Sequence, residues 1–305
     1  MPVGPHLLLT GASGFLGTVL RPRLSERYTV FPVSRRDRKD WVALDLVDDG
    51  AVRRAVKQFQ PAIVVHAAAW TSVDGCERDQ ATAYAENVLA TANLVNACKD
   101  LDRPPRFLFI SSDQFYDGPG PHREDALPTP RNVYALTKLW AESEAARMPN
   151  VLILRSNFFG LGRRPGDGLA RWLLDSLAAG REVKLFDDVL FNPLYIEDYA
   201  DLVCDLIASN AGGVVNVGAA GGGLSKAAFA RALAARFGLS TLSAVVGSVD
   251  DAKLPAVRPK DMRMDITRLR GLLPERTIPG IEAGIERMHR QAAAVSAHIG
   301  EDASP

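Results

Sequence analysis

Three side chains suited to proton transfer stand close together in the middle of the sequence. Ser112 follows the apolar segment FLFIS, and Tyr134 and Lys138 are four residues apart in the segment YALTK. Residues four apart share one face of a helix, so a phenol and an ammonium would lie side by side there. A neighbouring ammonium lowers the pKa of a phenol, and a serine hydroxyl can donate to a carbonyl oxygen on which charge develops. These groups predict carbonyl reduction if the chain also binds a nicotinamide.

A glycine-rich segment near the start of the chain predicts a site for a dinucleotide. Three glycines spaced three apart follow the apolar run HLLLT, and an amphipathic stretch follows them. Glycine permits a tight turn and close approach of the backbone, and free N–H groups at a helix start bind phosphate. A turn needed only for packing is the alternative interpretation. The cofactor-binding residues expected in this segment are Gly11, Ser13, Gly14, Phe15, Leu16 and Gly17.

The end of the second predicted strand indicates which nicotinamide cofactor is bound. In an NAD-preferring site, this strand ends in an acid that binds the ribose 2′-hydroxyl. Here it ends in Ser34, Arg35 and Arg36. Two guanidinium groups suit a 2′-phosphate, so we expect NADPH, with NADH as the alternative. Surface arginines that only contact solvent are the competing interpretation.

Two further strand ends are expected to contribute to the same site. Asp45 and Leu46 end the third predicted strand, where a carboxylate can accept from an adenine amine; a helix-capping role is the alternative. Ala67, Ala68 and Ala69 end the fourth. Small side chains at the carboxyl edge of a parallel sheet leave room for a ligand, although close packing also explains them.

With these residues the sequence resembles the extended short-chain dehydrogenase/reductase family. The glycine turn, Asn87 in ENVLATANLV, Ser112, Tyr134 and Lys138 fall where that family has its signatures. Within it, the segments HAAAWTSVDGCERD, SSDQFYDG and RPKDMRMD are most similar to the dTDP-4-dehydrorhamnose reductases, which are NADPH-linked 4-keto sugar nucleotide reductases. The resemblance runs from residue 6 to about residue 290.

The resemblance implies a role for each signature residue. Ser112 would polarise the substrate carbonyl, and Tyr134 would donate the proton. Lys138 would bind the nicotinamide ribose hydroxyls and lower the pKa of Tyr134. Asn87 would hold a proton-relay water or shape the site. Asn157, in LRSNFFG, would lie where the chain passes the nicotinamide.

The substrate site is expected to include an arginine, a tryptophan and the residues after Ser112. Arg258 in RPKD would bind the sugar-nucleotide pyrophosphate, with a structural salt bridge as the alternative. Trp70 would line the substrate cleft, although aromatic packing explains it as well. The family's 4,6-dehydratases have Asp-Glu after the serine or threonine, but here Gln114 follows Asp113. An amide cannot act as a base, which disfavours dehydration and leaves reduction or 4-epimerisation. The predicted substrate contacts are Trp70, Ser112, Asp113, Gln114, Asn157 and Arg258.

The order of the predicted elements indicates the fold that positions these residues. Short apolar runs alternate with amphipathic helical stretches, which is typical of a parallel sheet with helices on both faces. We therefore predict an α/β, Rossmann-type, doubly wound sheet with a smaller C-terminal α/β substrate-binding part. The predicted strands are 6–10, 28–33, 42–44, 62–66, 107–111 and 151–155, and the predicted helices are 14–26, 51–59, 81–99 and 133–148.

The second half has a looser pattern. A helix is expected over 168–180, then the strand VKLF, a helix over 196–209, a strand at 214–218 and a helix capped by Ser225. We expect an NADP-binding domain over 1–160 and a substrate-binding domain over 161–305, with segments near 192–218 that can return to the first domain. The proline-rich segment 117–131 is expected to be an irregular loop.

Composition excludes several other classes of protein. Lys and Arg total 36 residues, as do Asp and Glu, so no overall charge favours nucleic acid or an anionic membrane. No apolar run reaches the length of a membrane span, and three scattered cysteines suggest buried thiols in a reducing cytoplasm. The acids Asp74, Glu77 and Asp79 are interpreted as surface residues, so no metal site is expected.

The expected function is cytoplasmic NADPH-dependent reduction of a nucleotide-linked 4-keto-6-deoxy sugar. The alternatives are a sugar-nucleotide epimerase of the same fold and a non-catalytic NADP-binding regulatory subunit. The expected partner is the nucleotide-sugar substrate, and a homodimer is one assembly open to the chain.

Overall fold

Seven parallel strands form one sheet, as the alternating pattern predicted. The computed structural model describes residues 4–162 and 168–301, with side chains described to residue 294. The order of the strands in the sheet is β3-β2-β1-β4-β5-β6-β11. After β1 the chain adds strands toward one edge of the sheet, and from β4 it adds them toward the other edge. Parallel sheets of this kind bind ligands at that switch point. The strands are β1 (His6–Thr10), β2 (Thr29–Ser34), β3 (Val42–Ala43), β4 (Ile63–His66), β5 (Arg106–Ile110), β6 (Val151–Ser156) and β11 (Gly213–Val217).

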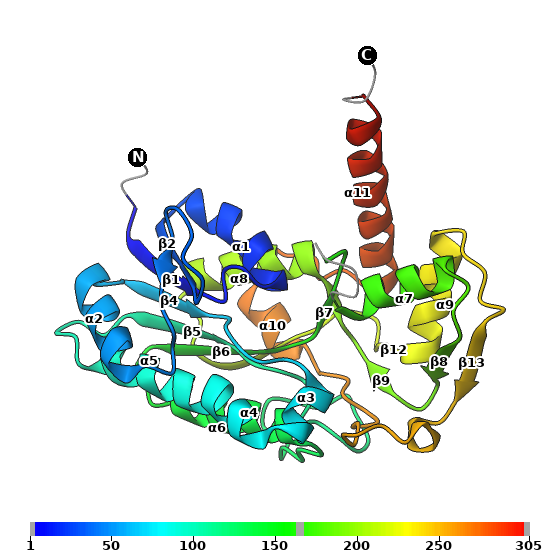
Figure 1. Ribbon diagram of the computed structural model, residues 1–305, viewed down its shortest axis with the longest axis horizontal. Coiled ribbons are helices and arrows are strands. Elements are labelled where there is room, and N and C mark those ends of the chain that lie inside the picture. Colours follow the sequence, from blue (N-terminus) through cyan, green and yellow to red (C-terminus); the bar gives the residue numbers. More distant parts are fainter. Residues whose placement is uncertain (1–3, 163–167, 302–305) are drawn as a thin grey trace.

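Helices cover both faces of this sheet (Figure 1). On one face α1 (Phe15–Ser25) packs against α8 (Ile196–Ala208), and α10 (Thr267–Leu272) lies against β11. On the other face lie α2 (Asp49–Phe59), α5 (Ala90–Lys99) and α6 (Val133–Ala145). Alternate residues of a strand point to opposite faces, so Leu7 and Leu9 join one apolar core while Leu8 joins the other.

Several short paired strands and three helices form the C-terminal part (Figure 1). They pack into the same apolar core as α1 and α8. Ser225 caps α9 as predicted, because its hydroxyl accepts a hydrogen bond from the Ala228 N–H at 3.0 Å. The pairs are β7 (Phe158–Phe159) with β10 (Leu194–Tyr195), β8 (Val183–Phe186) with β13 (Ala244–Gly247), and β9 (Leu190–Phe191) with β12 (Leu224–Ser225). The helices are α7 (Gly168–Ala178), α9 (Lys226–Arg236) and α11 (Ile281–Glu301).

The chain returns to the large sheet after its first visit to the C-terminal part. β11, at 213–217, pairs in parallel with β6 along five residues. The loop 117–131 is irregular apart from an isolated bridge between His122 and Met264. The domain boundary near residue 160 stays a prediction.

Several helical segments were not predicted as separate elements. The short ones are α3 (Val73–Arg78), α4 (Gln80–Tyr84), the π-helix η1 (Ala85–Leu89), the 3-10 helix η2 (Val249–Ala252) and α10, and the long helix α11 was not predicted either. The segments α4, η1 and α5 follow one another without a break where one helix over 81–99 was expected. The inserted π turn changes which side chains face the sheet, and such turns are frequent at functional sites.

Two other sequence-based expectations concern cysteines and membrane spans. The three cysteines are free thiols, with Cys76 and Cys98 buried and Cys204 partly buried. Across the described ranges, none of the helices combines the length and the apolar character needed to cross a bilayer.

Candidate active site

The glycine turn connects β1 to α1, and its three glycines meet different surroundings. A Cβ on Gly11, whose φ is +65°, would lie 2.6 Å from the backbone of Ala67, and one on Gly17 would lie 2.2 Å from the Gly11 carbonyl oxygen. These two glycines are required by the packing of the chain itself. A Cβ on Gly14 would have only one neighbour within 4 Å, the Gly11 carbonyl oxygen at 3.2 Å. Gly14 therefore exposes its backbone to the adjoining cleft.

This arrangement fits a bound pyrophosphate. The first glycine of such a turn makes the bend, the second lets the backbone approach the phosphates, and the third lets the helix pack closely. Gly14 is also the N-cap of α1, and no side chain caps this end of the helix. The unpaired N–H groups at that end and the helix dipole both favour an anion.

A cleft of about 570 Å³ extends from this turn to the predicted catalytic residues. Its walls come from the carboxyl ends of β1, β4, β5 and β6, from α6 and from the start of α7. It therefore joins the predicted cofactor and catalytic residues in one site. From those predictions it includes Gly11, Gly14, Phe15, Leu16, Gly17, Ala67, Ala69, Ser112, Asp113, Gln114, Tyr134, Lys138 and Asn157.

Helix α6 presents Tyr134 to the cleft, and the start of this helix is fixed at three points. The Asn132 side chain accepts from the Ala135 N–H at 2.8 Å and donates to the Val257 carbonyl at 2.8 Å. The Val133 N–H donates to Glu77 at 3.0 Å. These bonds satisfy donors at the helix start and hold the following turn in place.

The Tyr134 phenol lies near enough to the Ser112 hydroxyl for that side chain to act on its pKa. Both side chains are less than 10% exposed. Burial raises the pKa of Tyr134 to about 12, although the Ser112 hydroxyl acts in the opposite direction. At neutral pH the phenol is therefore protonated and able to donate.

Lys138 has different partners from those expected. Its ammonium donates to the Ile110 carbonyl at 2.8 Å and lies 4.2 Å from the centroid of the Phe109 ring. Burial lowers the pKa of Lys138 to about 7, and Glu142 partly opposes this. In this structure the ammonium is aimed at the end of β5. Its expected effect of lowering the pKa of Tyr134 stays a prediction.

Asp113, Gln114 and Asn157 form a polar group beside the two hydroxyls. Asp113 accepts from the Asn157 amide at 2.8 Å and from the Gln114 amide at 3.3 Å. Burial raises the pKa of Asp113 to about 6, while these amides and the charge of Lys226 oppose the rise. The Gln114 amide also donates to the Met262 sulfur at 2.9 Å. Both amides therefore support a carboxylate at the floor of the cleft.

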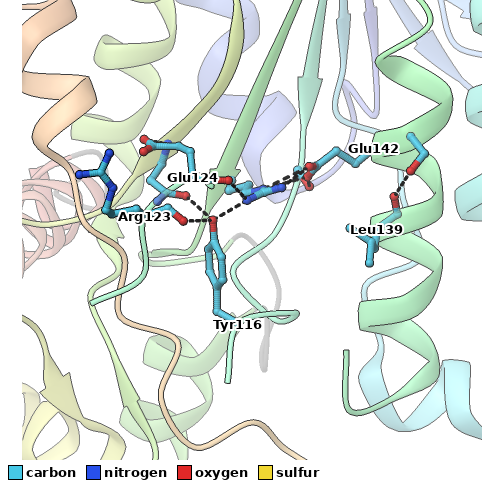
Figure 2. A network of polar contacts seen from close by, with 9 residues as sticks. Tyr116, Arg123, Glu124, Leu139 and Glu142 are labelled. Carbon is cyan, nitrogen blue, oxygen red and sulfur yellow. Dashed lines mark hydrogen bonds and ion pairs between the residues drawn. The ribbon is translucent and has the colours of Figure 1, made fainter. Parts of the chain in front are cut away.

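A buried ion pair lies behind helix α6. Glu142 accepts from the Arg155 guanidinium at 2.6 Å and from the Ser111 hydroxyl at 2.7 Å. The same guanidinium donates to the Tyr116 hydroxyl at 2.6 Å and to the Glu124 carbonyl at 2.9 Å. Figure 2 shows this network running from the loop at Tyr116 and Glu124 to Glu142 on α6. It joins β5, β6 and α6 where they meet at the cleft.

Asn87 has a structural arrangement that the resemblance did not specify. Its side chain accepts from the Trp70 N–H at 2.8 Å and donates to the Trp70 carbonyl at 3.2 Å and the Thr137 hydroxyl at 3.0 Å. Asn87 thus ties the segment after β4 to helix α6. Its position in the π turn η1 directs it there. A proton-relay role for Asn87 stays a prediction.

A smaller cleft of about 270 Å³ adjoins the glycine turn on the side of β2 and β3. Arg35 projects over it and forms an ion pair of 2.5 Å with Glu86, which also lines it. Asp45 accepts from the Val47 N–H at 3.0 Å, whereas the cap of α2 is Asp48. The size and the apolar strand ends fit an adenosine. The predicted cofactor residues that line it are Gly11, Ser13, Gly14, Ser34, Arg35, Asp45, Leu46, Ala67, Ala68 and Ala69.

Four predicted site residues do not line either cleft: Asn87, described above, and Arg36, Trp70 and Arg258. Arg258 forms a salt bridge of 2.9 Å with Asp74, which is the alternative that its sequence position left open. Trp70 packs beside Tyr134 in a small apolar cluster. Arg36 is exposed, and its backbone N–H donates to the Ser34 hydroxyl at 3.2 Å. Their roles with substrate or cofactor stay predictions.

The acids after β4 have structural partners. Besides the pairing of Asp74 with Arg258, Glu77 accepts from the start of α6, and Asp79 caps α4 by accepting from the Thr82 N–H at 3.0 Å.

The structure adds site residues that sequence reasoning missed. Ser111, Ser156 and Phe158 line the large cleft, and Glu142 with Arg155 supports it. Arg155 had a signal in the sequence, because a charged residue that ends the apolar run VLIL needs a buried partner. Glu142 is four residues after Lys138 and so shares its face of α6.

Comparison with known proteins identifies the relatives of this chain. The family model described as the RmlD substrate binding domain matches residues 5–291. The dTDP-4-dehydrorhamnose reductase of Streptomyces griseus is 33% identical over 219 residues, which are 70% of this chain and 69% of that protein.

Solved structures of similar proteins share the architecture. The chain matches a hypothetical dTDP-4-dehydrorhamnose reductase from Sulfolobus tokodaii with a TM-score of 0.78 and 30% identity, over 87% of this chain and 94% of the other. It matches dTDP-4-dehydrorhamnose reductase from Bacillus anthracis in complex with NADP with a TM-score of 0.84 and 24% identity, over 95% and 100% of the two chains. The second likeness concerns the fold.

Proposed function

We propose a function for this chain from the fact that it belongs to the RmlD substrate binding domain family. In this proposal the chain is an NADPH-dependent reductase of a nucleotide-linked 4-keto-6-deoxy sugar. The observation behind this proposal is that the buried side chains of Ser112 and Tyr134 both line a cleft that begins at the exposed backbone of Gly14. The names of the relatives support the choice of substrate class.

The two hydroxyls act on the substrate carbonyl. Both belong to buried side chains that line the cleft, where they can reach a single carbonyl oxygen. Ser112 donates a hydrogen bond to that oxygen, and Tyr134 gives it a proton as it becomes an alcohol. NADPH, when bound, supplies the hydride for the carbonyl carbon. The products are then the sugar alcohol and NADP⁺.

The remaining residues bind and orient. The backbone at Gly14 holds the pyrophosphate, and the smaller cleft holds the adenosine. Lys138 lies within the cleft wall and offers its ammonium to ribose hydroxyls. Asp113, held by Asn157 and Gln114, accepts from hydroxyls of the sugar. Such positioning makes the transfer effectively unimolecular.

The names of the relatives favour reduction over epimerisation. An epimerase must first remove a proton from the substrate alcohol, and burial, which raises the pKa of Tyr134, disfavours the phenolate that this step needs. Gln114 supplies no carboxylate for dehydration. The intact set of Ser112, Tyr134 and Lys138 argues against a regulatory subunit without activity. We place the enzyme in the cytoplasm, on the cysteine usage and composition of the sequence.

The experiment mixes the protein, NADPH and a dTDP-4-keto-6-deoxy sugar and follows the absorbance of the reduced nicotinamide. Tyr134→Phe should lower the rate by about 10²- to 10⁴-fold, because it removes the proton donor and little volume. Tyr84→Phe, on the exposed surface of α4, is the matched control and should retain the wild-type rate. Wild-type protein no faster than Tyr134→Phe would refute the proposal, as would inverted sugar without net oxidation of the cofactor.

A further inference from the structure

A third cleft, of about 570 Å³, lies on the other side of the glycine turn. It shares Ser13 and Gly14 with the smaller adenosine cleft, so the two clefts meet at the exposed part of the turn. The proposed function uses none of its other residues. Its lining residues are Ala12, Ser13, Gly14, Phe15, Thr18, Arg21, Pro22, Ser25, Arg38 and Trp41.

Two guanidinium groups contact one indole in this cleft. The guanidinium carbons of Arg21, on α1, and of Arg38, in the loop after β2, each lie 5.0 Å from the centroid of the Trp41 ring. Cation–π contacts restrict the side chains that make them. In the ranges that the structure describes, neither arginine has a carboxylate in an ion pair with it, although both are exposed. Two positive charges are thus held in place without local neutralisation.

The arginines expected from the sequence to bind the 2′-phosphate are situated differently. Arg35 is already paired with Glu86 at 2.5 Å and lines the adenosine cleft. A second anion would have to compete with that carboxylate for the same guanidinium. Arg36 lines neither cleft. Among the three arginines of this loop, Arg38 is the one that faces the border at Ser13 and Gly14 without an acidic partner.

We infer that Arg38 is the residue that binds the 2′-phosphate of the cofactor. Trp41 restricts its side chain, and Arg21 adds a second positive charge. Arg35 and Glu86 form a wall of the adenosine cleft. This inference rests on the proposed function for the identity of the ligand. A phosphate monoester carries nearly two negative charges at neutral pH, and a guanidinium can bind it through two parallel hydrogen bonds. A nucleotide with adenosine in the smaller cleft reaches Arg38 only through a substituent that crosses the shared border. The phosphate therefore selects NADPH over NADH.

The test measures binding by titration calorimetry, with 2′,5′-ADP and 5′-AMP as probes and no sugar present. Arg38→Ala should weaken 2′,5′-ADP by about ten- to a hundredfold, the loss of one charge-assisted contact, and should change 5′-AMP by less than about twofold. Arg35→Ala is the matched control, because it removes a guanidinium three residues away. It should weaken both probes by the same factor. Trp41→Leu should weaken 2′,5′-ADP selectively, but less than Arg38→Ala does.

Two results would overturn the inference: an unchanged affinity of Arg38→Ala for 2′,5′-ADP, or a selective loss in Arg35→Ala. Circular dichroism of each variant establishes that it is folded. This test is distinguishable from the test of the proposed function. If Arg38→Ala selectively loses affinity for 2′,5′-ADP but the wild-type protein reduces no keto sugar, the phosphate site stands and the proposed reductase activity is refuted. If the protein reduces the sugar but Arg38→Ala loses no affinity selectively, the activity stands and the phosphate site is refuted.

Discussion

At the scale of single residues, burial sets the proton affinities in the cleft. It raises the pKa of Tyr134 to about 12 and that of Asp113 to about 6, and it lowers the pKa of Lys138 to about 7. Each shift favours the neutral form of its group, as expected where water is excluded. The site thus holds a protonated phenol, a weakened carboxylic acid and an ammonium that loses its charge near neutral pH.

Asp113 makes a prediction about stability and pH. Its folded-state pKa is raised above the usual 3.8, so the native protein binds this proton more tightly than the unfolded chain. Its contribution to stability is then fully present below about pH 4 and is lost as the pH rises through 6. Asp113→Asn removes this dependence. The free energy of unfolding of the variant minus that of the wild type should therefore increase by about 2–3 kcal/mol between pH 4 and pH 7.

Urea denaturation of both proteins at a series of pH values measures this difference. A difference between them that stays constant from pH 4 to pH 7, or that falls, would show that burial does not destabilise the Asp113 carboxylate.

At the scale of elements, most of the long strands and helices could be predicted from periodicity, although the long helix α11 was not, and most of the two-residue strands could not. β1, β5 and β6 are continuous apolar runs, and α2 has its polar and apolar residues on separate faces. β7, β9, β10 and β12 have two residues each, too few for any pattern, and exist because distant segments pair with them. The π turn η1 was also not predicted, because its extra residue is fixed by the contacts of Asn87.

The glycine turn makes a prediction that separates packing from ligand binding. Gly17→Ala places a methyl group 2.2 Å from the Gly11 carbonyl oxygen and should destabilise the fold by about 2–3 kcal/mol. Gly14→Ala places it 3.2 Å from that oxygen and otherwise into the cleft. This variant should keep its stability within about 1 kcal/mol and lose at least about tenfold in affinity for the dinucleotide.

Thermal unfolding and NADPH titration of the two variants provide the comparison. Equal loss of stability in both, or unchanged NADPH affinity in Gly14→Ala, would mean that the exposed backbone at Gly14 is not where the pyrophosphate binds.

At the scale of the whole molecule, a buried polar network connects the cleft to the far end of the sheet. Arg155 on β6 bonds to Glu142 on α6 and to Tyr116, whose hydroxyl donates to Asn216 on β11 (Figure 2). Strands β5, β6 and β11 and helix α6 are therefore held by one set of bonds. The cleft residues at strand ends could be predicted from the sequence, because each motif consists of residues that are neighbours in the chain. This network could not be predicted, because its members come from four separated segments.

The ion pair predicts strong coupling between its two members. Arg155→Met should lower the free energy of unfolding by about 3–5 kcal/mol, because it leaves a carboxylate buried without its counter-charge. The double variant Arg155→Met, Glu142→Met should recover more than half of that loss. Chemical denaturation of the two single variants and the double variant forms a double-mutant cycle. Additive losses in the double variant would show that the two charges do not depend on each other.

The central claim is that hydride passes from the bound nicotinamide to the keto carbon of a nucleotide sugar, with Tyr134 as proton donor. The most direct measurement supplies NADPH with deuterium at the transferable position and determines the mass of the sugar product. The account predicts one deuterium in each alcohol formed and one NADP⁺ for each deuterium transferred. A sugar product without deuterium, formed without net oxidation of NADPH, would contradict it.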